Sequence, residues 1–129
     1  MIIGYAYVVG DILHRGHILH LKNCKALCDR LIVGVLSDEA VMEKKPKPVL
    51  SLEERMLLVE SLKFVDCVVM QDEYSPTANC RLMHPDILFE SDSHDEWGNN
   101  YDRKIIAMPY YKKQSSTKIK KEIKSGNSN

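Results

Sequence analysis

The sequence predicts an α/β fold in which a five-stranded parallel sheet is covered by helices on both faces. Two observations predict this architecture. Short, nearly continuous apolar runs of strand length recur along the chain, and such runs are typical of strands buried on both faces of a parallel sheet. Stretches with the spacing of amphipathic helices separate these runs, and this alternation implies crossover connections. The sequence therefore predicts a doubly wound, Rossmann-like sheet.

The chain of 129 residues is predicted to form one domain with a sizeable core. That domain is expected to extend over residues 1–124. The last residues, 125–129, have the small, polar sequence Ser-Gly-Asn-Ser-Asn. We expect them to form a disordered tail.

The first part of the chain is predicted to contain two strands and two helices. Ile2–Val9 and Leu31–Leu36 are apolar runs and are predicted to be strands. A helix is expected between them over Gly16–Cys28, because apolar side chains recur there at three- and four-residue spacing. The acidic run Ser37-Asp38-Glu39 is typical of a helix start, so a short helix should follow the second strand.

The middle of the chain begins with a predicted loop over residues 44–50, since Pro46 and Pro48 prevent regular structure there. Ser51 and Glu54 then form a predicted capping box. The helix that this box opens is expected to end near Lys63. Its inward positions are predicted to be Met56, Leu57, Val59 and Leu62.

Three more strands and two more helices complete the predicted fold. The strands are expected over residues 65–70, 86–90 and 104–108. One helix should start at Ser75-Pro76, with Pro76 at the first helical position, and end before Pro85. Residues 91–100 are polar and are predicted to form a loop, and the last helix is expected from about 115 to 125.

Composition and charge limit the partners and the compartment. The chain has 18 Lys and Arg and 18 Asp and Glu residues, so no net field favours nucleic acid or an anionic membrane as a partner. No apolar run approaches the ~20 residues of a membrane-spanning helix, and the first residues do not read as a signal peptide. We therefore expect a cytoplasmic protein whose cysteines are small buried side chains in a reducing compartment. These are Cys24, Cys28, Cys67 and Cys80.

A candidate anion site lies in Asp11-Ile12-Leu13-His14-Arg15-Gly16-His17, between the first predicted strand and the first predicted helix. A helix N-terminus offers backbone N–H groups and the positive end of its dipole to an anion. His14 and His17 add side-chain donors, and Gly16 lets a ligand approach the backbone without a Cβ in the way. The turn is therefore predicted to hold a polyphosphate, at the strand end where doubly wound sheets bind ligands.

A metal triad of His14, His17 and His20 is the alternative interpretation of this turn. On a helix, His20 lies about 240° round from His14, so the three imidazoles do not share a face. No metal site is predicted, and His20 is expected to be a partly buried helix residue.

Two motifs at opposite ends of the chain resemble those of the cytidylyltransferase-like nucleotidyltransferases, the HxGH superfamily. The first is the turn from Asp11 to His17, and the second is Gln114-Ser115-Ser116-Thr117-Lys118-Ile119-Lys120. Their order and spacing are similar to those of glycerol-3-phosphate cytidylyltransferases, from about Met1 to Ile123. The resemblance implies transfer of CMP from CTP to a small phosphate- or phosphonate-bearing acceptor by direct in-line attack, with release of pyrophosphate.

The resemblance also implies roles for individual residues. His14, His17, Lys44 and Lys47 would be catalytic through contacts with phosphate. Arg55 would contact the triphosphate, and Mg²⁺ would accompany CTP, held mainly by phosphate oxygens. A homodimer is implied as well. The implied nucleotide-binding positions are Val9, Gly10, Asp11, Gly16, Arg55, Ser91, Asp92, Gln114, Ser115, Ser116 and Thr117.

The chain departs from the glycerol-3-phosphate branch at three places. Val9-Gly10 stands where that branch has Thr-Phe, Ser91-Asp92-Ser93-His94 where it has a Gly-Asp-Asp-Trp loop, and Tyr110 where it has an arginine. Gly10-Asp11 is more similar to the cytidylyltransferase domains of phosphonate biosynthesis, as are Gln71, Pro76 and Asn79. The acceptor is therefore left open between a glycerol-3-phosphate-like compound and a phosphonate. The candidate acceptor-binding residues are Asp11, His94, Tyr110 and Lys112.

Two other functions are compatible with these motifs. An adenylyltransferase of the same superfamily is one, because the motifs contact the triphosphate rather than the base. A nucleotide-binding sensor or accessory subunit without turnover is the other, favoured by the replaced arginine and the altered acidic loop. For the lysines after the second strand, a solvated charge run is the simpler interpretation, and for Arg55 it is a surface arginine.

Overall fold

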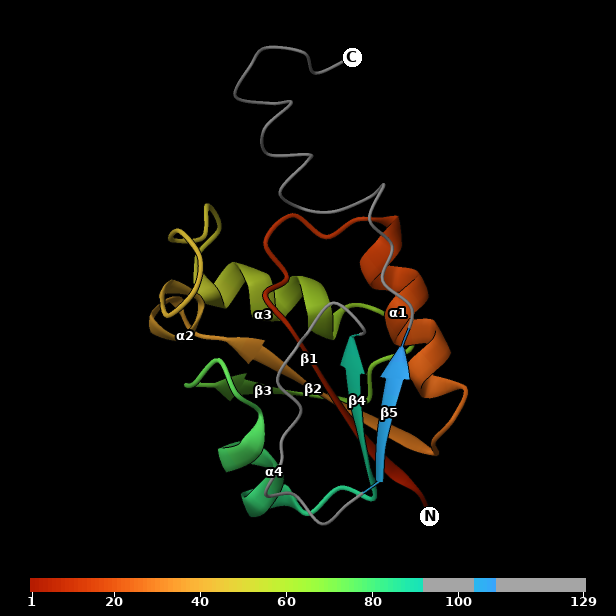
Figure 1. Cartoon of the computed structure of the whole chain (residues 1–129). Helices are drawn as coiled ribbons and strands as arrows, with labels where there is room; N and C mark the ends of the chain where they lie inside the picture. Colours follow the sequence, from red (N-terminus) through yellow and green to blue (C-terminus); the bar gives the residue numbers. More distant parts are fainter. Residues whose placement is uncertain (92–103, 109–129) are drawn as a thin grey trace.

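The computed structural model describes residues 1–91 and 104–108, and strands alternate with helices through most of this part of the chain (Figure 1). Every strand and all four helices described were expected from the sequence, with bounds that differ by up to three residues. In chain order the elements are β1 (Ile3–Val8), α1 (Arg15–Lys25), β2 (Arg30–Leu36), α2 (Asp38–Met42), α3 (Leu52–Glu60), β3 (Cys67–Gln71), α4 (Thr77–Met83), β4 (Ile87–Ser91) and β5 (Lys104–Met108).

The strands form one five-stranded sheet in the order β3-β2-β1-β4-β5, and every pairing is parallel. This confirms the predicted doubly wound fold. Strand β1 lies at the centre, with β2 and β3 added on one side and β4 and β5 on the other. The connection order therefore reverses between β1 and β4, and ligands of such sheets bind beyond the carboxyl ends of the strands at this reversal.

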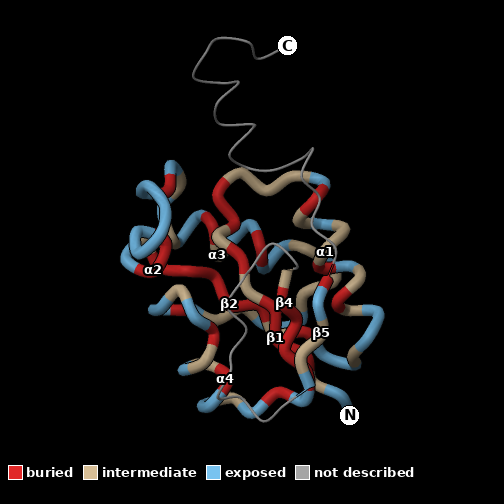
Figure 2. Tube along the Cα trace, in the orientation of Figure 1, coloured by how far each residue is buried: buried red, intermediate tan, exposed pale blue. Residues whose placement is uncertain are grey.

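Helices cover both faces of the sheet. Leu21 of α1 and Val59 of α3 pack with Val33 of β2 and Phe89 of β4 in the main core. On the opposite face, Cys80 of α4 packs with Tyr5 and Leu88. Buried residues are concentrated in the central strands β1, β2 and β4 (Figure 2). Each of these strands is covered on both sides, which accounts for its nearly continuous apolar sequence.

Serine N-caps set the starts of α2 and α3 at the positions expected from the sequence. The Ser37 hydroxyl accepts the N–H of Ala40, and the Ser51 hydroxyl accepts the N–H of Glu54. Helix α4 starts one residue later than predicted, with Pro76 as its N-cap rather than its first helical residue. The loop over residues 44–50 contains no strand or α-helix, as expected.

Some predicted buried positions are wrong. Leu57, predicted to face inward on α3, is 67% exposed, because the face that packs on the sheet is set by Arg55 and Val59, four residues apart. Cys67 is exposed because it begins the edge strand β3, and Cys28 is only partly buried because α1 ends before it. Cys24 and Cys80 are buried as expected.

Several expectations lie outside the described residues. These are the loop beyond Ser91, the last helix from about 115 and the tail of residues 125–129. Within residues 1–91 and 104–108, no helix has both the length and the apolar character needed to span a membrane.

Candidate active site

The turn between β1 and α1 has an unusual backbone. Gly10 has φ +72° and Ile12 has φ +64°, which places a β-branched residue in the left-handed region. Glycine accepts this conformation without cost. A Cβ at position 10 would also come within 3.3 Å of Val59 Cγ2 of α3. The two positive φ angles reverse the chain after β1 and bring it to the start of α1.

His14 and His17 cap the start of α1 with their ring nitrogens. Nδ1 of His14, the N-cap residue, accepts the N–H of Gly16 at 2.9 Å, and Nδ1 of His17 accepts the N–H of His14 at 3.2 Å. The ring centroids are 4.1 Å apart. Because Nδ1 is an acceptor in both rings, each neutral imidazole carries its proton on Nε2. The capping therefore fixes both histidines as Nε2–H donors.

Burial keeps both imidazoles neutral. Desolvation lowers the pKa of His14 below the ordinary 6.5. The pKa of His17 is lowered to about 3, first by desolvation and then by the nearby His14, His20 and Lys45. The two histidines therefore contribute hydrogen-bond donors rather than positive charge at neutral pH.

The prediction that free backbone N–H groups at this helix start hold the anion needs correction. The amides of His14 and Gly16 already donate to imidazole nitrogens. A histidine at the N-cap can accept such a bond in place of the usual hydroxyl or carboxylate. The donors that this pair offers to a ligand are accordingly on side chains.

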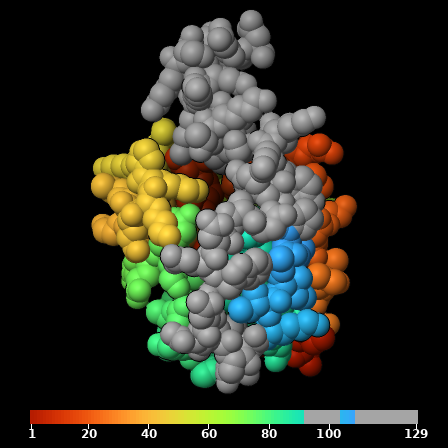
Figure 3. Space-filling view, viewed as in Figure 1, coloured from red at the N-terminus to blue at the C-terminus, as the bar shows by residue number. Residues whose placement is uncertain are grey.

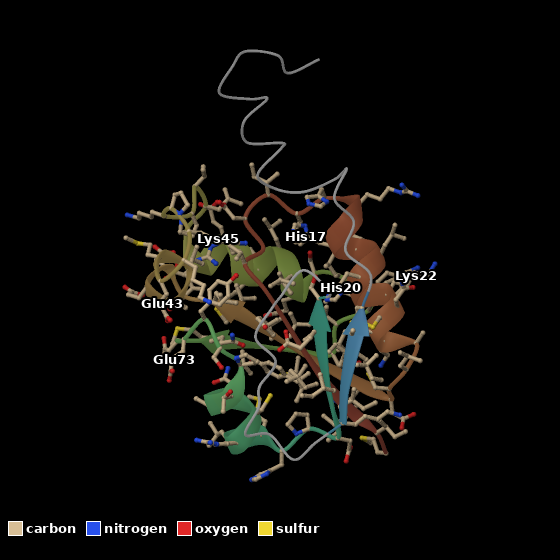
Figure 4. All side chains as sticks on the ribbon, viewed as in Figure 1. His17, His20, Lys22, Glu43, Lys45 and Glu73 are labelled. Atoms are coloured by element: carbon tan, nitrogen blue, oxygen red, sulfur yellow. The ribbon has the colours of Figure 1, made fainter. Side chains whose placement is uncertain are left out.

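Lys45 lies nearer to this histidine pair than the sequence suggested. Its charge is one of the causes of the low pKa of His17. Figure 4 shows Lys45 and His17 at the same end of the sheet, one after α2 and the other in α1. The sequence-based assignment favoured Lys44 or Lys47 over Lys45, because a loop with two prolines has no periodicity from which side-chain directions follow.

The other two lysines of this loop have different surroundings. The Lys44 ammonium lies 5.2 Å from the centre of the Tyr74 ring, a cation–π distance. Lys47 is exposed. In the space-filling view, the segment of residues 40–50 borders a hollow with N-terminal residues at its floor (Figure 3).

Asp11 anchors the lysine-containing loop to the turn. The Asp11 side chain is 1% exposed, and its two carboxylate oxygens accept the N–H groups of Val49 and Leu50, both at 2.9 Å. This carboxylate therefore joins the turn before α1 to the end of the loop over residues 44–50. The contacts make Asp11 a positioning residue for that loop.

Arg55 is placed differently from both of its sequence-based interpretations. It is 0% exposed, so it is not a surface arginine. Its guanidinium donates to the carbonyls of Leu50 at 3.2 Å, Val9 at 2.8 Å and Leu36 at 2.6 Å. It also pairs with Asp38 at 2.7 Å. With four of its five N–H donors in these bonds, the expected contact with a triphosphate does not fit this arrangement, and Arg55 instead holds the ends of β1 and β2 together.

The remaining predicted site residues divide into two groups. Val9, Gly10 and Gly16 lie at the carboxyl end of β1 or in the turn that follows, and Ser91 ends β4 beside it. The turn therefore brings these positions to the end of the sheet that carries the histidine pair. The others lie outside the described residues, namely Asp92, His94, Tyr110, Lys112, Gln114, Ser115, Ser116 and Thr117.

A histidine metal site is not formed by the described residues. Across residues 1–91 and 104–108, no group of three or more His, Cys, Asp or Glu side chains is arranged to hold a metal ion. Nε2 of His20 lies 3.9 Å from Sγ of Cys24, which is a contact within α1.

Comparison with known proteins supports the interpretation of the motif. Residues 10–122 match the model of the family described as cytidylyltransferase-like. "Bifunctional protein HldE" of Campylobacter fetus is 34% identical over 119 residues, which are 88% of this chain and 26% of that protein. The chain thus spans about a quarter of the length of the curated relatives it matches.

Solved structures share the fold. The lipopolysaccharide core biosynthesis protein of Thermoplasma volcanium superposes with a TM-score of 0.79 at 28% identity, over 86% of this chain and 98% of that one. Pantothenate synthetase of Thermus thermophilus has a TM-score of 0.57 at 13% identity, over 84% and 56% of the two chains, and shows the fold alone. Since the family match includes the His-x-Gly-His turn and extends over most of the sheet described above, the chain belongs to the cytidylyltransferase-like family of nucleotidyltransferases.

Proposed function

We propose that this protein transfers CMP from CTP to a small phosphate- or phosphonate-bearing acceptor and releases pyrophosphate. The observation that carries the proposal is the pair of neutral imidazoles at the carboxyl end of β1, both fixed as Nε2–H donors. Nucleotidyl transfer asks the protein mainly to position the reactants and to stabilise charge on phosphoryl oxygens. Fixed donors in a partly buried turn suit that task.

In the proposed reaction, an anionic oxygen of the acceptor attacks the α-phosphorus of CTP in line with the leaving group. A bond forms between that oxygen and the α-phosphorus, and the bond from the α-phosphorus to the bridging oxygen of pyrophosphate breaks. Pyrophosphate leaves with the electron pair of that bond. The Nε2–H groups of His14 and His17 would donate to the phosphate oxygens on which negative charge accumulates.

Lysine charges after α2 would support the same step. Lys45 is the lysine whose charge reaches His17, and Lys44 and Lys47 belong to the loop that Asp11 anchors. Mg²⁺ would be held mainly by the triphosphate oxygens, where it neutralises charge. The hydroxyls of Ser115, Ser116 and Thr117 remain proposed contacts of the triphosphate.

The base and the acceptor are the finer parts of the proposal. The names of the relatives state neither CTP nor a phosphonate. An adenylyltransferase is the second candidate, because the histidine pair is suited to bind phosphate and does not select the base. The solved relative named for lipopolysaccharide core biosynthesis favours a sugar-like phosphate among the acceptors to be tested. A nucleotide-binding sensor without turnover is the third candidate function. We also propose a homodimer, which light scattering would test, and a cytoplasmic location.

The test is pyrophosphate release with CTP and with ATP, each against a panel of small phosphates and phosphonates. We expect turnover with CTP and one acceptor, reduced about a hundred- to a thousandfold in His14→Ala. His20→Ala is the matched control, because His20 lies on the same helix without capping its start. Turnover with ATP alone would assign the adenylyltransferase, and nucleotide binding without turnover on the whole panel would favour the sensor.

A further inference from the structure

We propose that Tyr7, oriented by the buried carboxylate of Glu90, binds a hydroxyl group at the end of the acceptor distant from its phosphate. The inference rests on the function proposed above and narrows the substrate class to small hydroxylated phosphates or phosphonates. Tyr7 and Glu90 take no part in the phosphate chemistry assigned to the histidines and lysines.

The first argument is position. Tyr7 and Glu90 each lie one residue before the end of their strands, β1 and β4, which are neighbours in the sheet. The connection order reverses between these two strands. Both residues therefore lie at the place where doubly wound sheets bind ligands, at the same end of β1 as the histidine turn.

The second argument is the face of the sheet. Tyr7 packs with Val9 and Tyr74 against a cluster built around α2. Helix α1, which carries His17, packs on the opposite face with the main core. In-line transfer requires the attacking and leaving oxygens on opposite sides of the α-phosphorus. If the histidines hold the nucleotide phosphates, the acceptor can extend toward Tyr7.

The third argument is the hydrogen bond between the two side chains. Tyr7 Oη donates to Glu90 Oε2 at 2.7 Å, and Glu90 is 0% exposed. Burial and the Glu90 charge raise the pKa of Tyr7, so the phenol keeps its proton. Because that proton is directed to Glu90, a ligand group that binds Oη must itself donate. A hydroxyl can do so, whereas a phosphate dianion cannot and is repelled by the carboxylate.

Tyr5 provides an internal comparison. It lies two residues earlier on the same face of β1 and is 0% exposed, while Tyr7 is partly exposed. The Tyr5 phenol donates to Gln71 at 2.5 Å and accepts from Asn79 at 3.0 Å, so it belongs to the core. Tyr5→Phe therefore removes the same atom as Tyr7→Phe without touching the proposed acceptor site.

The experiment compares binding of glycerol 3-phosphate and propyl phosphate, which has the same phosphate but no free hydroxyl. Affinities are measured by calorimetry on the whole chain with the α,β-methylene analogue of CTP or ATP, whichever binds. We expect wild type and Tyr5→Phe to prefer glycerol 3-phosphate about tenfold, the effect of one hydrogen bond. In Tyr7→Phe the preference should fall below about threefold.

Glu90→Gln tests the charge separately, because the amide oxygen can still accept the Tyr7 proton. The probe is 3-phosphoglycerate, whose carboxylate replaces the distal hydroxymethyl group. Wild type should bind it at least about tenfold more weakly than glycerol 3-phosphate, and Glu90→Gln should narrow this gap to a few-fold. A merely structural role for Glu90 would leave the ratio unchanged. If circular dichroism shows that Tyr7→Phe does not fold, the ratio of the affinities for glycerol 3-phosphate and 3-phosphoglycerate in Glu90→Gln tests the proposal instead.

The outcomes separate this inference from the proposed function. Equal binding of glycerol 3-phosphate and propyl phosphate by wild type overturns the role of Tyr7, whether or not the protein turns over. A hydroxyl preference that survives in Tyr7→Phe overturns it as well. Selective binding without pyrophosphate release would leave the inference standing and refute only the transferase activity.

Discussion

At His17, the environment of one imidazole decides its protonation state. The pKa of about 3 lies below the ordinary 6.5 because the ring is desolvated and has His14, His20 and Lys45 as neighbours. Between these two pH values the unfolded chain binds a proton at this site and the folded chain does not. The free energy of unfolding therefore decreases as the pH falls from about 6.5 toward about 3.

We predict that His17→Asn reduces this pH dependence. The difference in unfolding free energy between pH 7.5 and pH 5, measured by urea denaturation, should be smaller in the variant than in wild type. His84→Asn, at an exposed position that is not among the neighbours of His17, serves as the control. An identical pH dependence in wild type and His17→Asn would show that His17 titrates normally in the folded protein.

Arg55 is the other residue whose surroundings determine its role. The family resemblance implied a contact with the triphosphate, and nothing in the sequence indicates that three carbonyls and Asp38 surround Arg55. These partners come from the turn after β1, from β2, from α2 and from the loop before α3, so they become neighbours only in the folded chain. The sequence could therefore identify the residue but not its function.

Arg55→Lys should be strongly destabilising, although it keeps the charge. A lysine ammonium cannot reproduce the planar arrangement of donors, and each buried carbonyl that loses its donor costs about 1–3 kcal/mol. The exposed Arg81→Lys should change the free energy of unfolding by less than about 0.5 kcal/mol. Chemical denaturation measures both. Similar losses in the two variants would contradict the role assigned to Arg55.

At the scale of elements, the loop over residues 44–50 depends on the turn before α1. Its prolines and lysines were visible in the sequence, but its attachment to Asp11 was not, because that contact joins positions 38 and 39 residues apart. Helix α3 also could be predicted from the sequence only in part. Its start followed from local capping chemistry, whereas its buried face depended on what Arg55 contacts.

We predict that Asp11→Asn loosens this loop without unfolding the protein. An asparagine presents one N–H₂ group to a backbone N–H, so one of the two bonds is lost at a cost of about 1–3 kcal/mol. Hydrogen exchange at Val49 and Leu50 should accelerate, and KM for the nucleotide should rise more than kcat falls. The exposed Asp72→Asn is the control, and unchanged exchange at both amides would refute the anchoring role.

At the scale of the whole molecule, the sheet was predictable because alternation of apolar runs and helical periods is a property of the entire chain. The order of the strands was not, since it depends on which buried faces match. Gly34 illustrates the difference. It lies in the apolar sequence of β2, yet a Cβ there would collide with Tyr5 Oη and come within 2.8 Å of Gln71 Oε1, a residue of β3.

Gly34→Ala should therefore lower the free energy of unfolding by about 1–3 kcal/mol through overpacking. The added methyl group would displace the hydrogen bond between Tyr5 and Gln71, which passes over β2 from β1 to β3. Leu82→Ala, at a side chain that is 77% exposed, should change it by less than about 0.5 kcal/mol. Urea denaturation compares the two variants. A free energy of unfolding in Gly34→Ala equal to that of wild type would contradict the tight packing at this position.

The hydrogen bonds of Arg55 also have a consequence for how the molecule forms. The bond from its guanidinium to the Val9 carbonyl closes a separation of 46 residues, and the Leu36 bond closes one of 19. Long separations are closed late and slow the search for the native state. The histidine turn precedes α3 in the chain, so the carbonyls that support it lack the Arg55 donors until α3 has been synthesised. Ligand binding should thus emerge together with global folding rather than in a fragment that ends before α3.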